Sequence, residues 1–144
     1  MAKDVMETVK KKLKDGWIKA WMAVEVLALT EEAAESSLKK HIDILEKEDS
    51  CIIYKKDFSK TDKVPNPFKD PKYAYSKVVE VEFVAKRFEN LVWIVLNYAP
   101  SSIEILEPKN IRLELGEAQG VLNSLSELIH NFAISSRGAV MIDT

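Results

Sequence analysis

The sequence predicts an α+β protein in which an N-terminal helical, winged-helix-like unit is followed by a small ferredoxin-like α/β unit. Two observations support this order. Apolar residues recur at helical spacing in residues 4–50, whereas apolar and charged residues alternate, as in a strand, from residue 76 onward. Three prolines interrupt the segment between them. We therefore divide the chain into a helical unit at 1–58, a Pro-rich connector at 59–76 and an α+β unit with a C-terminal helix and tail at 77–144.

The N-terminal unit opens with two predicted helices. The first covers residues 4–15 and ends at Gly16, because a residue without a Cβ suits the C-terminus of a helix. The second covers residues 17–29, where Trp17 and Trp21 stand about one helical turn apart within a nearly continuous apolar run. We expect these two tryptophans to lie in the core; the alternative is an aromatic platform on which a ligand stacks.

A third predicted helix covers residues 30–50, and a strand follows at residues 51–58. The hydroxyl of Thr30 suits an N-cap, and the apolar side chains of this helix fall on one face. Three helices followed by a strand give the outline of a winged helix-turn-helix, an arrangement that commonly reads nucleic acid.

The charges of the third helix argue against direct contact with DNA. A recognition helix presents its first solvent-facing residues to the groove, and here these include Glu31, Glu32 and Glu35, which phosphates repel. We expect weak or absent nucleic-acid binding, and a role for the unit in packing or in contact with a partner protein. The candidate nucleic-acid or partner contacts are Lys39, Lys40, Lys55 and Lys56.

The C-terminal unit is predicted to alternate strands and helices. Prolines limit its elements, since the residue before Pro100 is pushed out of the helical region and Pro108 cannot donate to a sheet. Glu80, Glu82 and Glu104 fall on the outer faces of strands, where they form either an acidic patch for a cation or a solvated sheet face. In order, the predicted elements are a strand at 76–85, a helix at 86–99, strands at 102–106 and 110–116, and a helix at 117–132.

A pattern of apolar residues around two prolines runs through residues 81–125, in Leu91, Trp93, Ile94, Leu96, Pro100, Ile105, Leu106, Glu107 and Pro108. This segment resembles the C-terminal extension module of WYL-domain transcription regulators, although Ala99 stands where a glycine is usual. The resemblance implies a regulatory or oligomerising module, and it carries over no ligand or site. The chain also resembles an uncharacterised archaeal family, which implies no function.

The sequence contains no familiar catalytic or cofactor motif. It lacks a GxGxxG fingerprint, a Walker phosphate loop, HExxH and GxSxG. His41, His130 and Cys51 have no suitable partners near them along the chain, so we interpret them as structural or surface residues. We therefore predict a non-enzymatic protein without cofactor or metal; an enzyme with an unrecognised site is the alternative.

Composition indicates a folded protein of the cytoplasm. Of its 144 residues, 47% are hydrophobic and 31% are charged, and no apolar run approaches the roughly 20 residues that span a bilayer. The first residues lack the apolar core of a signal peptide, and a single cysteine precludes an internal disulfide. The net charge of −2 does not suit a strongly basic nucleic-acid module, while abundant lysine points to a thermophilic source.

These features predict a regulatory or protein-interaction module, related to transcription regulation and present as a homodimer. The dimer contacts are expected at exposed strand edges and in the apolar tail, where Val140, Met141 and Ile142 form a β-prone run. The alternative is a sensor that binds a small molecule between the two units.

Overall fold

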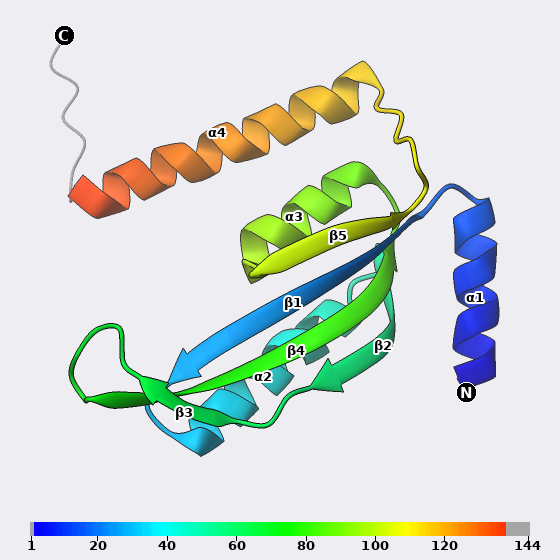
Figure 1. Ribbon diagram of the computed structural model, residues 1–144. Coiled ribbons are helices and arrows are strands. Elements are labelled where there is room, and N and C mark those ends of the chain that lie inside the picture. Colours follow the sequence, from blue (N-terminus) through cyan, green and yellow to red (C-terminus); the bar gives the residue numbers. More distant parts are fainter. Residues whose placement is uncertain (1, 138–144) are drawn as a thin grey trace, which may run out of the picture.

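The computed structural model describes residues 2–137, which contain one antiparallel sheet with α2 and α3 on one of its faces (Figure 1). Within these residues, no helix is both long enough and apolar enough to cross a membrane. The elements are, in chain order, α1 (Ala2–Lys14), β1 (Ile18–Ala28), α2 (Glu31–Glu46), β2 (Cys51–Phe58), β3 (Asp62–Pro65), β4 (Tyr73–Ala85), α3 (Phe88–Tyr98), β5 (Ser102–Glu107) and α4 (Leu115–Arg137).

The strands of the sheet follow the order β2-β4-β1-β5, and every pair is antiparallel. The short strand β3 pairs with the first residues of β4, on the same edge of β4 that β2 occupies further along. Without β3, the chain runs β1-α2-β2-β4-α3-β5, which is the β-α-β-β-α-β connectivity of ferredoxin-like modules. A mixed α and β fold is therefore confirmed, but this connectivity starts at β1 and is not confined to the C-terminal half.

Residues 17–29 contain a central strand where a helix was predicted, so the winged-helix outline is wrong. β1 pairs with β4 along its whole length, from Ile18 opposite Ala85 to Ala28 opposite Tyr75. The prediction failed because the run is apolar at nearly every position, and such a run satisfies the helical and the strand period alike. β1 faces the main core with one side along most of its length, and its other side carries half-buried Trp21 and buried Ala23, so both sides are apolar.

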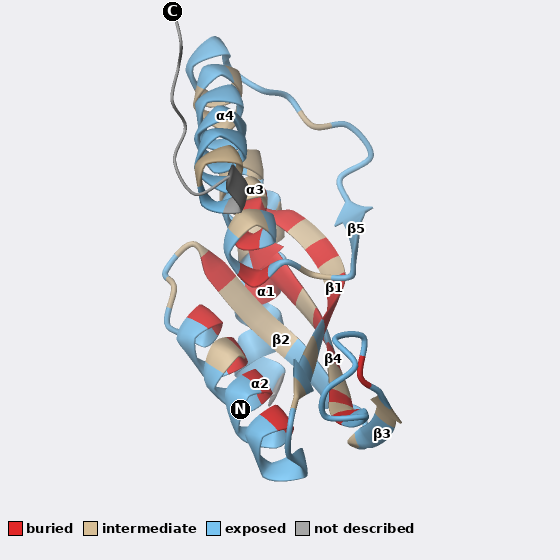
Figure 2. Ribbon diagram, turned by 90° about the vertical axis from the view of Figure 1, so that its left-hand side faces the viewer, coloured by how far each residue is buried: buried red, intermediate tan, exposed pale blue. Residues whose placement is uncertain are grey.

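The main core lies between the sheet and the helices α2 and α3 (Figure 2). Phe83 and Met22, on neighbouring strands, are fully buried there. α2 presents the apolar face predicted for it, and Thr30 caps this helix by accepting a hydrogen bond of 3.1 Å from the Ala33 amide. The helical side of this core consists of Leu38, Ile42 and Leu45 of α2 and Leu91, Ile94 and Tyr98 of α3.

A smaller core holds α1 against the opposite face of the sheet, near β2 and β4. Val9 of α1 packs with Trp17 and Val84, and all three side chains are buried. Gly16 joins α1 to Trp17 with a φ of 94°, a left-handed conformation that favours glycine and agrees with the helix end predicted here. Among the described residues, no other helix packs on this face (Figure 1).

The two predicted units share one sheet, because β1 lies between β4 and β5. Part of the expected connector also belongs to the sheet, since β3 pairs with the start of β4. Buried Asn66 fixes the loop between these two strands. Its side-chain amide donates to the Pro71 carbonyl at 2.7 Å, and its side-chain oxygen accepts from the Phe68 amide at 2.9 Å.

The helix and strand on either side of Pro100 are confirmed. α3 ends at Tyr98, and β5 begins at Ser102 and ends just before Pro108. Ala99 between them has a φ of 43°, in the left-handed region where a glycine would carry less strain. This backbone conformation explains why a glycine would be the ordinary residue at such a helix end.

The strand predicted at 110–116 is wrong, because residues 108–114 form no strand and α4 begins at Leu115. The apolar residues of this segment alternate with polar ones, but Ile111 packs on the main core from an irregular chain segment. The alternation does not mark a buried side of this segment, because Leu113 and Leu115 are 39% and 84% exposed.

Candidate functional site

The sheet face opposite α2 and α3 carries a tryptophan between two acidic residues. Trp21 lies on the central strand β1, and the register of the sheet places Glu82 of β4 on one side of it and Glu104 of β5 on the other. Neighbouring strands lie about 4.8 Å apart, so these side chains form a row about 10 Å wide. We call this surface, which also includes Glu80 and Leu106, the open face.

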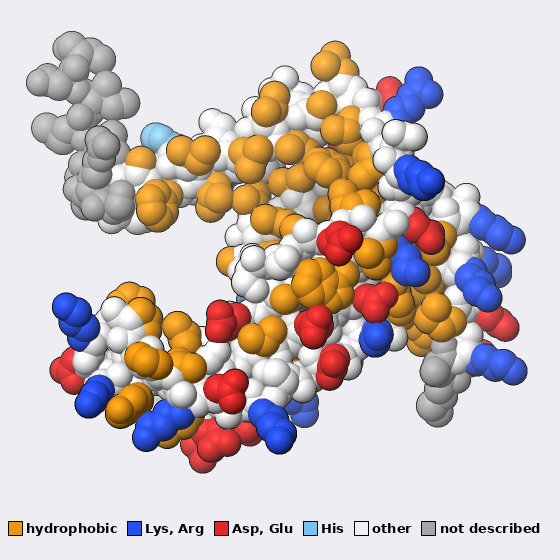
Figure 3. Space-filling view, in the orientation of Figure 1, with side chains coloured by type: hydrophobic (Ala, Val, Ile, Leu, Met, Phe, Trp, Pro, Cys, Tyr) orange, Lys and Arg blue, Asp and Glu red, His pale blue; other side chains and the backbone are white. Residues whose placement is uncertain are grey.

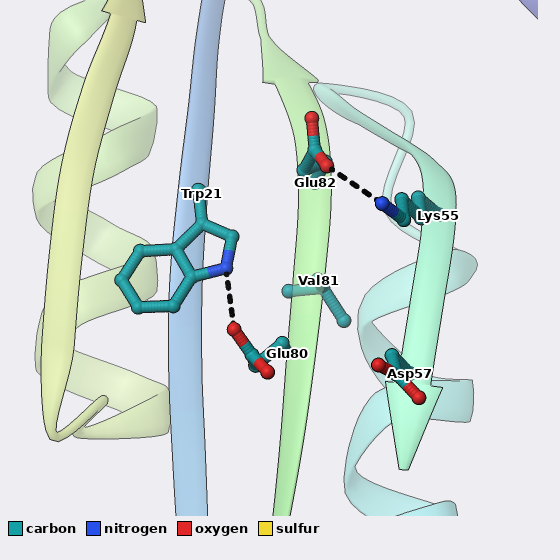
Figure 4. Close-up of a pocket in the computed structure, with 6 residues that line it drawn as sticks. All are labelled: Trp21, Lys55, Asp57, Glu80, Val81 and Glu82. Carbon is teal, nitrogen blue, oxygen red and sulfur yellow. Dashed lines mark hydrogen bonds and ion pairs between the residues drawn. The ribbon is translucent and has the colours of Figure 1, made fainter.

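Hydrogen bonds and an ion pair hold the side chains of the open face (Figure 4). The indole Nε1 of Trp21 donates to Glu80 Oε1 at 3.2 Å. Glu82 accepts a hydrogen bond of 3.1 Å from the Tyr54 hydroxyl and pairs with the Lys55 ammonium at 3.5 Å. Figure 4 shows the indole ring spread over β1, with a flat side turned toward the viewer. The ring is therefore presented to a ligand that approaches the sheet from this side.

The open face is acidic. Its hollow has a volume of about 250 Å³ and is lined by the carboxylates of Asp57, Glu80 and Glu82 but by only one ammonium group. The pKa of Tyr54 is raised by burial, by its hydrogen bond to Glu82 and by the negative charges of Glu82 and Glu107. In Figure 3, acidic side chains gather over this part of the sheet. A cation is favoured at such a surface, and a phosphate is repelled.

The glutamates that the sequence placed on outer strand faces, Glu80, Glu82 and Glu104, do lie on one face. Sequence reasoning missed Trp21 as their neighbour because it assigned this residue to a buried helix. The signal was present in the alternation of β1, where even-numbered residues from Ile18 to Val24 are buried in the main core and Trp21 is on the other side. In residues 2–137, no cluster of three His, Cys, Asp or Glu side chains is arranged to hold a metal ion.

A second surface lies where α3, β5 and α4 meet. It is an almost wholly apolar groove of about 590 Å³, which we call the α4 groove. α4 packs mainly on α3 and then extends past it (Figure 1), and most of its residues are exposed (Figure 2). Leu122, Ile129 and Phe132 are 61%, 67% and 72% exposed. The groove is lined by Phe88, Leu91, Val92, Val95, Leu96, Ile103, Glu104, Ile105, Val121 and Leu125.

Both surfaces fall within the part of the chain that matches a family model. The model of the MJ0538 family matches residues 19–142. The chain belongs to the MJ0538 family. No curated protein and no solved structure matches it. Membership in the MJ0538 family agrees with the resemblance to an archaeal family, whereas the comparisons give no support to the resemblance to WYL-domain regulators.

In this MJ0538-family protein, the four lysines predicted as contacts do not form one basic surface. Lys55 and Lys56 point to opposite faces of β2, and each pairs with a glutamate. Lys39 and Lys56 line a hollow of about 360 Å³ together with Lys77, Glu35 and Asp43, and Lys40 is exposed on α2. The predicted contacts in the tail lie outside the described residues: Val140, Met141 and Ile142.

The reactive side chains noted in the sequence have different environments. Burial, and secondarily the charge of Glu48, raises the pKa of Cys51 to about 12, so this residue is a neutral thiol at neutral pH. The ring of His41 packs on Tyr98 with 4.4 Å between ring centroids. His130 is exposed on α4. A nucleophilic thiolate is therefore disfavoured at Cys51.

Proposed function

We propose that this protein is a non-enzymatic interaction module that binds a basic segment of a partner protein on its open face. The observation that carries the proposal is the row of Glu82, Trp21 and Glu104, in which an aromatic ring has a carboxylate on either side. A Lys or Arg side chain over an indole face gains about 0.5–2 kcal/mol, and nearby carboxylates attract the same charge. The ring and the carboxylates thus favour the same class of ligand.

The width of the row favours a segment without helical structure. In a polyproline II conformation, residues i and i+3 lie on the same side of the chain and are about 9 Å apart. This separation is close to the width of about 10 Å between Glu82 and Glu104. Basic side chains at these positions reach both carboxylates, and the chain between them crosses Trp21. Basic segments without a fixed fold populate this conformation before binding, which lowers the cost of ordering them.

A partner of this kind is consistent with a role in regulation, including the regulation of transcription. Proteins that contact nucleic acid often carry basic arms, whose charge binds phosphates. An acidic module that binds such an arm competes with the nucleic acid for it. The proposed role in transcription is therefore indirect and acts through the partner protein.

We expect the protein to bind a short fluorescent peptide with a lysine at every third position. The same peptide with glutamate at those positions should not bind. Trp21→Ala removes the aromatic surface, so the peptide dissociation constant rises about 5- to 30-fold, as a loss of about 1–2 kcal/mol requires. Fluorescence anisotropy at low and at physiological salt measures both effects.

Trp93→Ala is the matched control, because Trp93 is a partly exposed tryptophan on α3 that does not line the open face. This variant binds the lysine peptide as the unchanged protein does. Glu104→Gln, which keeps the shape of the side chain and removes its charge, weakens binding and reduces its dependence on salt. Equal binding of both peptides, or equal effects of the two tryptophan variants, contradicts the proposal.

The same charges lead to a prediction for nucleic acid. Binding to duplex DNA is expected to be weak and to disappear at moderate salt, because Lys55 and Lys56 are paired with glutamates and the open face repels phosphate. A mobility-shift titration between low and physiological salt measures this. Nanomolar, sequence-selective binding at physiological salt is the result that would overturn it.

A small-molecule sensor is the alternative function, and the α4 groove favours it. Its volume of about 590 Å³ falls in the usual range for ligand pockets, roughly 300–1,000 Å³. The groove lies wholly within the second predicted unit and not between the two. A small apolar molecule would fill this groove but would leave the exposed residues further along α4 in water. The interaction module is therefore the better-supported function.

A further inference from the structure

The exposed side of α4 has the residue spacing of a helix–helix contact. Leu122, Leu125, Ile129 and Phe132 follow one another at intervals of three and four residues, as the a and d positions of a heptad do. All four are exposed in the single chain, and monomeric proteins rarely leave an extended apolar patch in water. We propose that a second copy of this chain covers this stripe, with the two α4 helices antiparallel in a closed two-fold dimer. The dimer surface meets the open face at Glu104, which lines both, but the proposal does not depend on the function proposed for the open face.

The length of α4 indicates that another element packs on its second half. The helix has 23 residues and is about 35 Å long, whereas α3, on which it packs, has 11 residues and is about 17 Å long. Its second half therefore extends beyond its support. Helical segments this short are marginal in water unless an amphipathic face packs against another element. The second copy provides that element.

The absence of charged residues beside the stripe favours an identical partner. With Leu122 at an a position, the e and g positions between residues 119 and 135 carry no charged side chain. Glu127 falls at f and His130 at b, both away from the contact. Two identical helices therefore meet without like charges facing each other across the two-fold axis. A different partner would instead be selected by complementary charges at these positions, and none are present.

The exposed apolar area is large enough for a stable dimer. The stripe continues into the α4 groove, where Val95, Ile103 and Ile105 are also exposed. Together with Leu128, these side chains add to the stripe, and the eight residues are between 37% and 72% exposed. Their combined exposed area is roughly 700 Å² for each copy, near the roughly 800 Å² per partner of a standard interface.

The position of the α4 groove determines how the two α4 helices of the dimer are oriented. It lies beside Val121 and Leu125, in the first half of α4, whereas Ile129 and Phe132 lie in the second half. Antiparallel helices place the second half of one copy over the first half of the other, so Ile129 faces the partner's Leu125. Each groove is then covered by apolar residues of the other copy. A parallel arrangement would bring the two grooves to the same end and leave both open.

Sedimentation velocity of the full chain, between about 2 and 200 µM, tests the proposal. The expected mass is twice the 16.4 kDa of one chain. Ile129→Glu places a charge in the contact and raises the dimer dissociation constant at least about tenfold, whereas Asn131→Glu adds the same charge at a c position and leaves the dimer intact. Both residues are exposed in the single chain, so circular dichroism should confirm that both variants fold.

Single-cysteine substitutions test the orientation. Leu125→Cys and Ile129→Cys are expected to form a disulfide with each other when the two variants are mixed, and each forms fewer crosslinks alone. Cys51 is buried, so it should not form a disulfide with either introduced cysteine. A monomer at all concentrations, equal effects of the two glutamate substitutions, or crosslinking of each variant mainly with itself overturns the proposal. A monomer that an apolar dye stabilises would assign the groove to a small molecule instead, and would also overturn it.

Discussion

Replacing Phe83 with alanine is expected to lower the free energy of unfolding by about 3–5 kcal/mol. Phe83 is the largest fully buried side chain of the main core, and it lies on β4, the strand that pairs with β1, β2 and β3. The substitution removes the apolar area of the ring from the core and leaves a cavity between the sheet and the two helices that cover it. Since whole domains are stable by about 5–15 kcal/mol, this loss is a large fraction of the total.

Chemical denaturation at one fixed protein concentration measures this effect, because any self-association would add a concentration-dependent term. Phe83→Leu is the graded control: it keeps most of the apolar volume and should cost clearly less than the alanine variant. Glu82→Ala, at the neighbouring position on the opposite face, should cost clearly less than Phe83→Ala, because it removes a hydrogen bond and an ion pair worth about 1 kcal/mol each. If all three variants lose similar stability, the assignment of Phe83 to the main core is wrong.

Elements with local signals could be predicted from the sequence. Thr30 marks the start of α2 through its own hydroxyl, and Pro100 marks the end of α3 through its effect on the preceding residue. β2 has the bounds expected for it, Cys51–Phe58, and β5 matches the segment between two prolines. In each case the signal lies within a few residues of the structure that it determines.

Elements whose signals are non-local could not be predicted. The apolar run of residues 17–29 becomes a strand because it pairs with β4, whose partner residues are some 50 to 70 positions away in the chain. The open face exists for the same reason, since only the sheet register brings Glu82 and Glu104 to either side of Trp21. The apolar residues of α4 were correctly assigned to one helix, but the sequence alone does not say which of them the rest of the chain leaves exposed.

Substitution of Trp17 is expected to lower the free energy of unfolding much more than substitution of Trp21, although the predicted helix placed both in the core. Trp17 is 8% exposed and packs with Val9 of α1 and Val84 of β4. The Lys12 ammonium also lies 4.8 Å from the centre of its ring. Trp17→Ala should therefore lower the free energy of unfolding by about 3 kcal/mol or more, at the low end of the range for large buried aromatic residues.

The local consequence of Trp17→Ala is the release of α1. With 13 residues, this helix is too short to persist alone in water, so it should unfold when its anchor is lost. Its lysines then become available to trypsin, and brief digestion followed by mass spectrometry should show cleavage near Lys10 and Lys14 before any other part of the chain. Trp21→Ala is the matched control: it should leave α1 protected and cost clearly less than Trp17→Ala, because Trp21 is only half-buried and does not pack on α1. Equal protection of α1 in both variants would show that Trp17 does not hold this helix to the sheet.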